Sequence, residues 1–248
     1  MEWGNYERLR PDELERLVRA APVAYWPLGL LEHHGWHLPV GFDGVKAQRL
    51  CQRMAARTGG VVLPVMWWGG GGGHGEFKWT LYQPVEAPET VLRATLHRLP
   101  HFGFRCVVLL AGHYPWRSAI EEVLPEFRRE YPDVLVIHGT EADVGAPELC
   151  LDGDHAARWE TAYGLALLPE LVELDALTPG RSEREAWPPG GPPQEEDRHP
   201  RVNFAAEDPL FAQYGEDARR ADAAEAERAL ERLAAHVAER VEQHLKEG

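Results

Sequence analysis

The stretch Glu32-His33-His34-Gly35-Trp36-His37-Leu38-Pro39-Val40-Gly41-Phe42-Asp43 places two carboxylates and three imidazoles within twelve residues. It follows directly on Val23 to Leu31, an apolar run whose length predicts a buried β-strand. Glu32 and His34 are two residues apart, so their side chains point to the same face of an extended backbone. Asp43 follows a Gly-Phe turn and can swing back onto the same point. Carboxylates and imidazoles without a thiolate suit Zn²⁺, Mn²⁺ or a similar catalytic divalent ion.

The alternative is a polar turn in which His33 or His37 only caps backbone groups. His33 is expected to point away from Glu32 and His34 if the strand persists. His37 is a candidate for orienting a metal ligand from behind. Three ligand-type residues at the end of one strand favour the metal site over the plain turn.

The first 140 residues alternate between two hydrophobic periods, which predicts strands separated by helices. Strands are expected at 23–31, 61–66, 105–110 and 133–138, and helices from Pro11 onward and at 45–57, 88–99, 117–131 and about 156–168. Short and nearly continuous apolar strands of this kind form parallel sheets covered on both faces. We therefore predict an α/β fold, a layered sandwich with a mostly parallel central sheet flanked by helices, in a single domain over residues 1–248.

Polar side chains follow the predicted strands at the edge where such sheets bind ligands. Glu32 follows the first strand, the run Gly69–Gly75 the second, and His113 the third. Gly112 allows a sharp bend, after which His113 is the natural further ligand. The glycine run lacks the Gly-Lys-Ser/Thr ending of a phosphate loop. It is therefore expected to form a flexible pocket wall, with His74 lining the pocket.

A second polar segment, Asp152 to Thr161, opens the helix expected after the fourth strand. At about 100° per residue, His155 and Glu160 lie about 140° apart on a helix, so they bracket a pocket. His155 can shuttle protons, and Glu160 can reach a second metal ion. The alternative is that Asp152 or Asp154 caps the helix and Glu160 is a surface acid.

The composition narrows the class of partner. The formal net charge of −14 argues against nucleic acid or an anionic membrane surface. Three scattered cysteines without a C-x-x-C pair suggest reduced thiols and a cytoplasmic location. The sequence has no basic and apolar leader, and no apolar run approaches the ~20 residues of a membrane helix. We expect a small-molecule substrate and no membrane association.

Two features lie in the last third of the chain. Residues 182–200 are rich in Pro, Gly and Glu, which predicts a surface loop without a helix or central strand. We expect this loop to be either a lid over the active-site mouth or an arm on a neighbouring subunit. Residues 230–245 carry apolar side chains at helical spacing, which predicts an amphipathic helix.

These motifs resemble the creatininase (creatinine amidohydrolase) family. The family signature Glu-x-His-Gly-x-His-Leu-Pro, followed by Asp, is matched by Glu32 to Pro39 and by Asp43. The family's Asn-Gly-His turn is similar to Ala111-Gly112-His113, and its His-Ala-Gly-x-x-Glu-Thr segment is similar to residues 155–161. The resemblance covers roughly residues 23–175 and the C-terminal helix.

The resemblance implies a two-metal hydrolase in a layered α/β fold, usually a homohexamer. By position, Asp43 would bridge two divalent ions, Zn²⁺ and/or Mn²⁺, with Fe²⁺ as a further candidate. Glu32 and His113 would complete one site, and His34 with Glu160 would complete the other.

The implied reaction is hydrolysis of a C–N amide bond, in the first instance of a small cyclic amide. A metal-bridging hydroxide would attack the carbonyl, and His155 would pass a proton to the leaving nitrogen. The alternatives are ring opening of a cyclic ketone or lactone by the same hydroxide, and a metal-binding module without enzymatic activity.

The chain departs from the family beside the proposed ligands. Pro115 stands where creatininase itself has a glutamate ligand, and Trp116 stands where the family has asparagine. Ala157 replaces the glycine of His-Ala-Gly. These changes reshape the substrate pocket, so creatinine is not assumed as the substrate. The residues expected to line that pocket are His37, His74, Tyr114 and Trp116.

Overall fold

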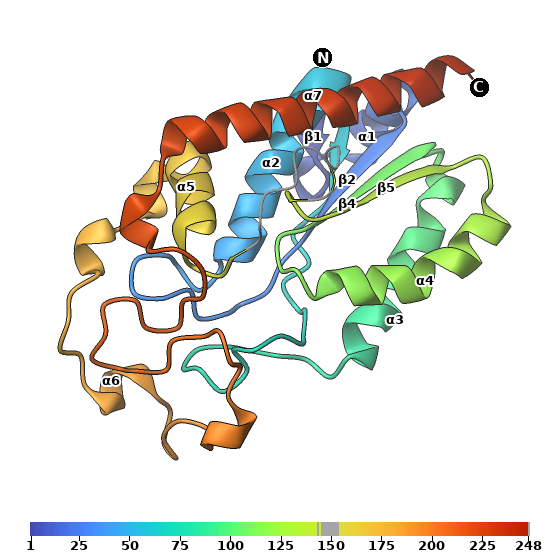
Figure 1. Ribbon diagram of the computed structural model, residues 1–248. Coiled ribbons are helices and arrows are strands. Elements are labelled where there is room, and N and C mark those ends of the chain that lie inside the picture. Colours follow the sequence, from blue (N-terminus) through green and yellow to red (C-terminus); the bar gives the residue numbers. More distant parts are fainter. Residues whose placement is uncertain (143, 145–153, 248) are drawn as a thin grey trace.

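A single parallel sheet forms the centre of the computed structural model, which describes residues 1–142, 144 and 154–247. The strand order is β1-β3-β2-β4-β5, and all four pairings are parallel (Figure 1). The strands are β1 (Trp3–Asn5), β2 (Val23–Leu28), β3 (Gly60–Val62), β4 (Cys106–Ala111) and β5 (Leu135–Gly139). The predicted α/β sandwich with a parallel sheet is confirmed.

Helices cover both faces of this sheet (Figure 1). Helices α1, α3 and α4 lie on one face, and α2, α5 and the long α7 lie on the other. The helices are α1 (Pro11–Ala20), α2 (Phe42–Thr58), α3 (Glu86–Arg98), α4 (Trp116–Glu130), α5 (Arg158–Leu167), α6 (Glu183–Ala186) and α7 (Ala223–Glu247). Among the described residues, no helix has the length and apolar character needed to cross a bilayer.

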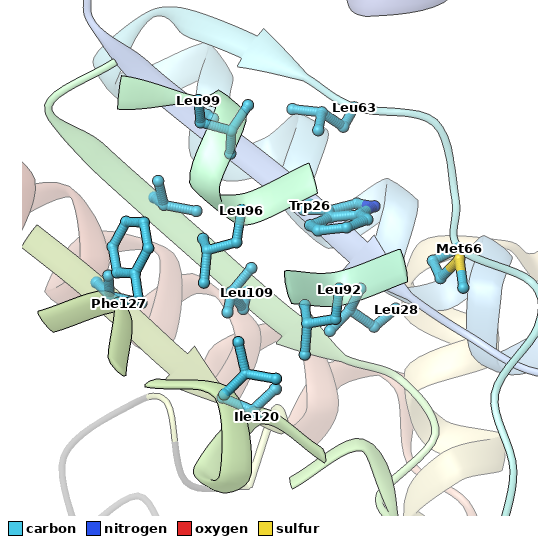
Figure 2. Close-up of a cluster of buried hydrophobic side chains, with 14 of the residues drawn as sticks. Trp26, Leu28, Leu63, Met66, Leu92, Leu96, Leu99, Leu109, Ile120 and Phe127 are labelled. Carbon is cyan, nitrogen blue, oxygen red and sulfur yellow. The ribbon is translucent and has the colours of Figure 1, made fainter. Parts of the chain in front are cut away.

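The side chains of β2 point alternately to the two faces of the sheet, which explains why helices cover both faces. Trp26 and Leu28 point to the face under α3 and α4, whereas Val23 and Tyr25 point to the face under α2 and α7. Figure 2 shows the first face, where Trp26 and Leu109 pack against side chains of the two covering helices. A strand buried on both sides has to be apolar throughout, as its sequence is.

The predicted second strand ends earlier than expected. β3 stops at Val62, and Met66 rejoins the sheet only through a single bridge to Leu28. Pro64 has no backbone N–H to donate, so it interrupts the ladder. The edge strand β1 was not predicted, because three residues are too short to show a hydrophobic period.

Residues 182–200 contain a short helix, α6, so the prediction that no helix forms in this segment was wrong. Ser182 donates from its backbone N–H and its Oγ to the Glu185 carboxylate, at 2.9 and 2.7 Å. This Ser-x-x-Glu capping pair starts the helix despite the surrounding prolines. Ala186 and Trp187 are buried in an aromatic cluster with Phe77 and Phe211.

Candidate metal centre

Five predicted ligand residues come together where the strands end. Glu32 and His34 lie in the coil after β2, which ends at Leu28, three residues earlier than the strand expected at 23–31. Asp43 lies in the first turn of α2, His113 follows β4, and Glu160 lies in the first turn of α5. All five are buried, with exposed fractions between 1% and 4%.

Two sets of ligand atoms meet at Asp43. Its Oδ1 lies 3.0 Å from His34 Nε2, and its Oδ2 lies 3.3 Å from His113 Nδ1. Glu32 Oε2 is 3.1 Å from His113 Nδ1, and Glu160 Oε2 is 3.6 Å from His34 Nε2. The ligand atoms of Glu32, Asp43 and His113, here called the Glu32 set, lie within 4.8 Å of one another. The same holds for His34, Asp43 and Glu160, here called the Glu160 set.

Backbone carbonyls determine which nitrogen of each ring faces the carboxylates. His34 Nδ1 lies 3.0 Å from the Glu32 carbonyl oxygen, and His113 Nε2 lies 3.0 Å from that of Gly71. A carbonyl oxygen only accepts, so these two nitrogens carry hydrogen and donate. His34 Nε2 and His113 Nδ1 are thereby directed at the carboxylates. Metal-binding histidines are held in this way, so the donor groups fit divalent ions.

The charges in this cluster shift its pKa values. Burial alone would lower the pKa of His113, but the charge of Glu32 and the hydrogen bond to Asp43 raise it to about 10. Burial alone would also lower the pKa of His34, but the charge of Asp43 raises it to about 9. Burial would raise the pKa of Asp43, but the charge of His34 and the hydrogen bond from His113 hold it well below its usual range.

His155 lies beside the two sets but outside helix α5, which begins at Arg158. The expectation that His155 and Glu160 share one helix was therefore wrong. A backbone bridge to Tyr214 holds His155 in place. Its Nε2 donates to the His33 carbonyl oxygen at 2.8 Å, and its Nδ1 is 4.0 Å from Glu32 Oε2. Burial lowers the pKa of His155 well below its ordinary value, so the ring is neutral at neutral pH.

A cavity of about 240 Å³ opens beside these groups. His74 and Tyr114, two of the residues proposed to line a substrate pocket, line this cavity. The full lining consists of Glu32, Asp43, Gly72, Gly73, His74, Gly112, His113, Tyr114, Pro115, Asp154, His155, Glu160, His199 and Tyr214.

Two residues expected in the pocket lie elsewhere. Trp116 opens α4 and points into the core, where its Nε1 donates to the Gly29 carbonyl oxygen at 2.9 Å. Most of the surface of an indole ring is apolar, so Trp116 is more stable packed between the sheet and the helices than exposed to water in a pocket. His37 is buried behind the site, and its Nε2 lies 2.7 Å from the hydroxyl oxygen Oγ1 of Thr161. The two assignments to the pocket lining were wrong.

The chain matches the family model described as creatininase, creatinine amidohydrolase, over residues 7–241. The chain belongs to the creatininase family. Creatinine amidohydrolase of Pseudomonas putida is 29% identical over 196 residues, which cover 71% of this chain and 73% of that protein.

Solved structures of creatininases have the same fold as this chain. A crystal structure of creatinine amidohydrolase is 26% identical with a TM-score of 0.75, covering 96% of both chains. A zinc–zinc form of a creatininase variant is 25% identical with a TM-score of 0.75, covering 96% of this chain and 97% of that one. A manganese form is 25% identical with a TM-score of 0.72 and the same coverage.

This creatininase-family chain holds further polar residues that the sequence motifs did not indicate. Lys46 is buried beside Glu160, and its only sequence signal is that it interrupts the apolar face of α2. Glu141, which pairs with Lys46 at 2.7 Å, follows β5 outside any motif. His199 and Tyr214 come from the segments around α6 and before α7, and nothing local links them to the site.

Asp154 holds the start of α5, the role that the sequence left to Asp152 or Asp154, and it also lines the cavity. Its carboxylate accepts the backbone N–H groups of Trp159, at 2.6 Å, and of Glu160, at 3.0 Å, at the start of α5. Burial together with the charge of Glu160 raises the pKa of Asp154 to about 7. The other capping candidate, Asp152, lies outside the described residues.

Proposed function

We propose that this chain is a two-metal hydrolase that cleaves a C–N amide bond, in the first instance of a cyclic amide, in a small substrate. The observation that carries the proposal is that two sets of buried ligand atoms share Asp43. In this assignment the Glu32 set holds one ion and the Glu160 set holds the other. Membership of a family described as creatinine amidohydrolase supports the choice of reaction.

The ions would be Zn²⁺ and/or Mn²⁺, as in the solved relatives, with Fe²⁺ as a further candidate for the same donors. When bound, two such ions polarise a substrate carbonyl and lower the pKa of water. The all-oxygen-and-nitrogen donor set and the orientation of His34 and His113 support this choice.

His155 would move the proton in this reaction. Its Nε2–H bond to the His33 carbonyl leaves Nδ1 unprotonated and directed toward the Glu32 side of the cavity. Because the ring is neutral, Nδ1 can accept a proton and then return it to the leaving nitrogen. The His74 ring stacks on His155 with centroids 3.6 Å apart and keeps that nitrogen in place.

The cavity also bears on the substrate. A volume of about 240 Å³ lies below the usual range for drug-sized ligands, which favours a small molecule. Tyr82 donates from its hydroxyl to Glu32 Oε1 at 2.8 Å, which fixes the orientation of this proposed ligand.

Metal analysis and a substrate panel test the proposal. Two ions per chain, together with turnover of small cyclic amides, would support it. Turnover of cyclic ketones or lactones alone would favour ring opening instead of amide cleavage. Two bound ions without turnover of any class would indicate a metal-binding module, and one or none would refute the two-metal assignment.

We further propose that the protein is cytoplasmic and assembles into a homo-oligomer, with a homohexamer expected from the family resemblance. Large apolar side chains between residues 68 and 85 support an assembly surface. Trp68, Trp79, Leu81 and Val85 are between 47% and 67% exposed. Light scattering on the purified chain measures the number of subunits.

Metal loading should release protons. His34 and His113 have pKa values of about 9 and about 10. In metal-free protein at about pH 7 both nitrogens of each ring are therefore protonated, and the rings are positively charged. One nitrogen of each ring keeps its hydrogen, which it donates to a backbone carbonyl. The other nitrogen has to lose its proton before it can bind a metal ion. We expect release of about two protons per chain when both ions bind. Calorimetric titration of Zn²⁺ in buffers of different ionisation enthalpy measures this number, and a value near zero would contradict the assignment of the two rings as ligands.

His199 should affect substrate binding more than chemistry. It belongs to residues 182–200 and lines the same cavity as the proposed metal ligands, stacked on Tyr214 with ring centroids 5.8 Å apart. We expect His199→Ala to raise KM about fivefold and to leave kcat within about twofold, the pattern of lost uniform binding. Steady-state kinetics measure both constants, with the exposed His101→Ala as control. An unchanged KM would contradict the hypothesis that residues 182–200 act as a lid.

A further inference from the structure

Lys46 lies on α2 one turn after Asp43, and its ammonium group is enclosed by carboxylates. Nζ is 2.7 Å from Glu141 Oε1 and 2.7 Å from Glu160 Oε1. The residue is only 1% exposed. Burial alone would lower the pKa of Lys46, but the charges of Glu141 and Glu160 outweigh it and raise the pKa. A full positive charge is therefore held directly behind a proposed metal ligand.

The carboxylate of Glu160 is held at both oxygens. Oε1 accepts from Lys46, and Oε2 accepts the backbone N–H of Ala156 at 2.8 Å. Oε2 also lies 3.6 Å from His34 Nε2. With Oε1 fixed on the ammonium group, Oε2 is the oxygen that faces His34 and Asp43.

Glu141 connects this arrangement to the cavity wall. Its Oε1 accepts from Lys46 and also from the Tyr114 hydroxyl, at 3.0 Å. The Tyr114 ring lies 5.4 Å from Lys46 Nζ and lines the cavity. Lys46 is thus held from one side by Glu141, and it holds Glu160 on the other.

Stability alone does not explain a lysine at this position. Apart from Asp43 and Thr58, the other buried residues of α2 carry no polar side chain, among them Ala47, Leu50 and Met54. A buried ion group is often no more stable than well-packed hydrophobic residues of similar volume. The lysine therefore calls for an explanation in the arrangement that it imposes on its partners.

We infer that Lys46 is a positioning residue for the Glu160 set. It acts through Glu160, whose Oε2 it presents to the ion, and Glu141 holds the ammonium group in place. This inference rests on the proposed two-metal function. It adds a residue, outside every family motif noted above, that controls the affinity of one site and leaves the other unchanged.

The test is the double variant Lys46→Met/Glu141→Gln. Lys46→Met alone would strand Glu141 as an unpaired buried charge and risks unfolding the protein. In the double variant both side chains keep about the same volume, and the group of three retains one net negative charge, as in the parent. Any change in metal affinity then reports the orientation of Glu160 instead of the local charge. Circular dichroism and the melting temperature verify that the variant is folded.

Zn²⁺ binding to the purified full chain is measured by competition with a chelator. We expect the first ion to bind as in the parent and the second to bind about tenfold or more weakly, the usual effect of losing such a supporting contact. In a Glu160→Gln background the same double change should have no further effect, because Lys46 acts through Glu160.

Parental affinity for both ions in the double variant would overturn the inference and make Lys46 a purely structural residue. Losses that add fully to those of Glu160→Gln would also overturn it, since Lys46 would then act by another route. If the parent chain itself binds fewer than two ions, the two-metal function fails and this inference fails with it.

Discussion

Replacing Asp43 with alanine should remove both metal ions and reduce amide hydrolysis on the order of 10³-fold or more. Asp43 belongs to both the Glu32 set and the Glu160 set, so its loss takes a ligand from each site. Its two oxygens also face different imidazoles, His34 and His113. Elemental analysis of the purified variant measures the ion content, and the initial rate on the best amide of the panel measures the activity.

Two variants make this result interpretable. Asp12→Ala removes an exposed aspartate from the first turn of α1 and should change neither ion content nor rate. Glu160→Gln should weaken mainly one ion, because Glu160 belongs to one set. Retention of two ions by Asp43→Ala would show that Asp43 does not bridge the two sites.

His155→Ala should keep both ions and lower the rate by about 10²–10⁴-fold, the usual contribution of general acid–base catalysis. The structure gives the reason, since His155 Nδ1 is unprotonated and faces the cavity while Nε2 is occupied by the His33 carbonyl. Metal content and turnover are measured on the same preparation.

The variant His155→Gln separates a role of His155 in proton transfer from a structural role through its hydrogen bond to the His33 carbonyl. The Gln amide can still donate to the His33 carbonyl, but it has no basic nitrogen for the cavity. We expect it to be as inactive as His155→Ala. Recovery of the rate in His155→Gln would make His155 a structural residue. Loss of one ion in either variant would instead make it a metal ligand, which is the alternative raised by the third group of close ligand atoms, Glu32, His34 and His155.

Local patterns in the sequence were sufficient for the layered fold. The apolar runs of β2 and β4 are buried on both faces, and that requirement leaves a visible pattern without any knowledge of the partners. The Glu-x-His spacing and the Gly112-His113 turn were likewise local, and they follow strands whose carboxyl ends meet at one edge of a parallel sheet. These local patterns were enough to propose Glu32, His34, Asp43 and His113 as ligands, whereas they left Glu160 open between a ligand and a surface acid, and only the family resemblance favoured the ligand.

Contacts between distant segments could not be predicted in this way. Trp116 is adjacent in sequence to a pocket residue, Pro115, yet the first turn of α4 directs its indole into the core. His37 meets Thr161, which lies 124 residues away. A residue's neighbours in sequence do not determine which side of a helix start faces the sheet and which faces the cavity.

The clearest case is the buried lysine. Its partners, Glu141 and Glu160, lie 95 and 114 residues further along the chain. The sequence by itself determined the class of fold, the edge of the sheet that carries the candidate site and the chemical type of its proposed ligands, because periodicity and turns are properties of short segments. Only the tertiary structure decided which oxygens and nitrogens face one another, because packing of the helices on the sheet sets those distances.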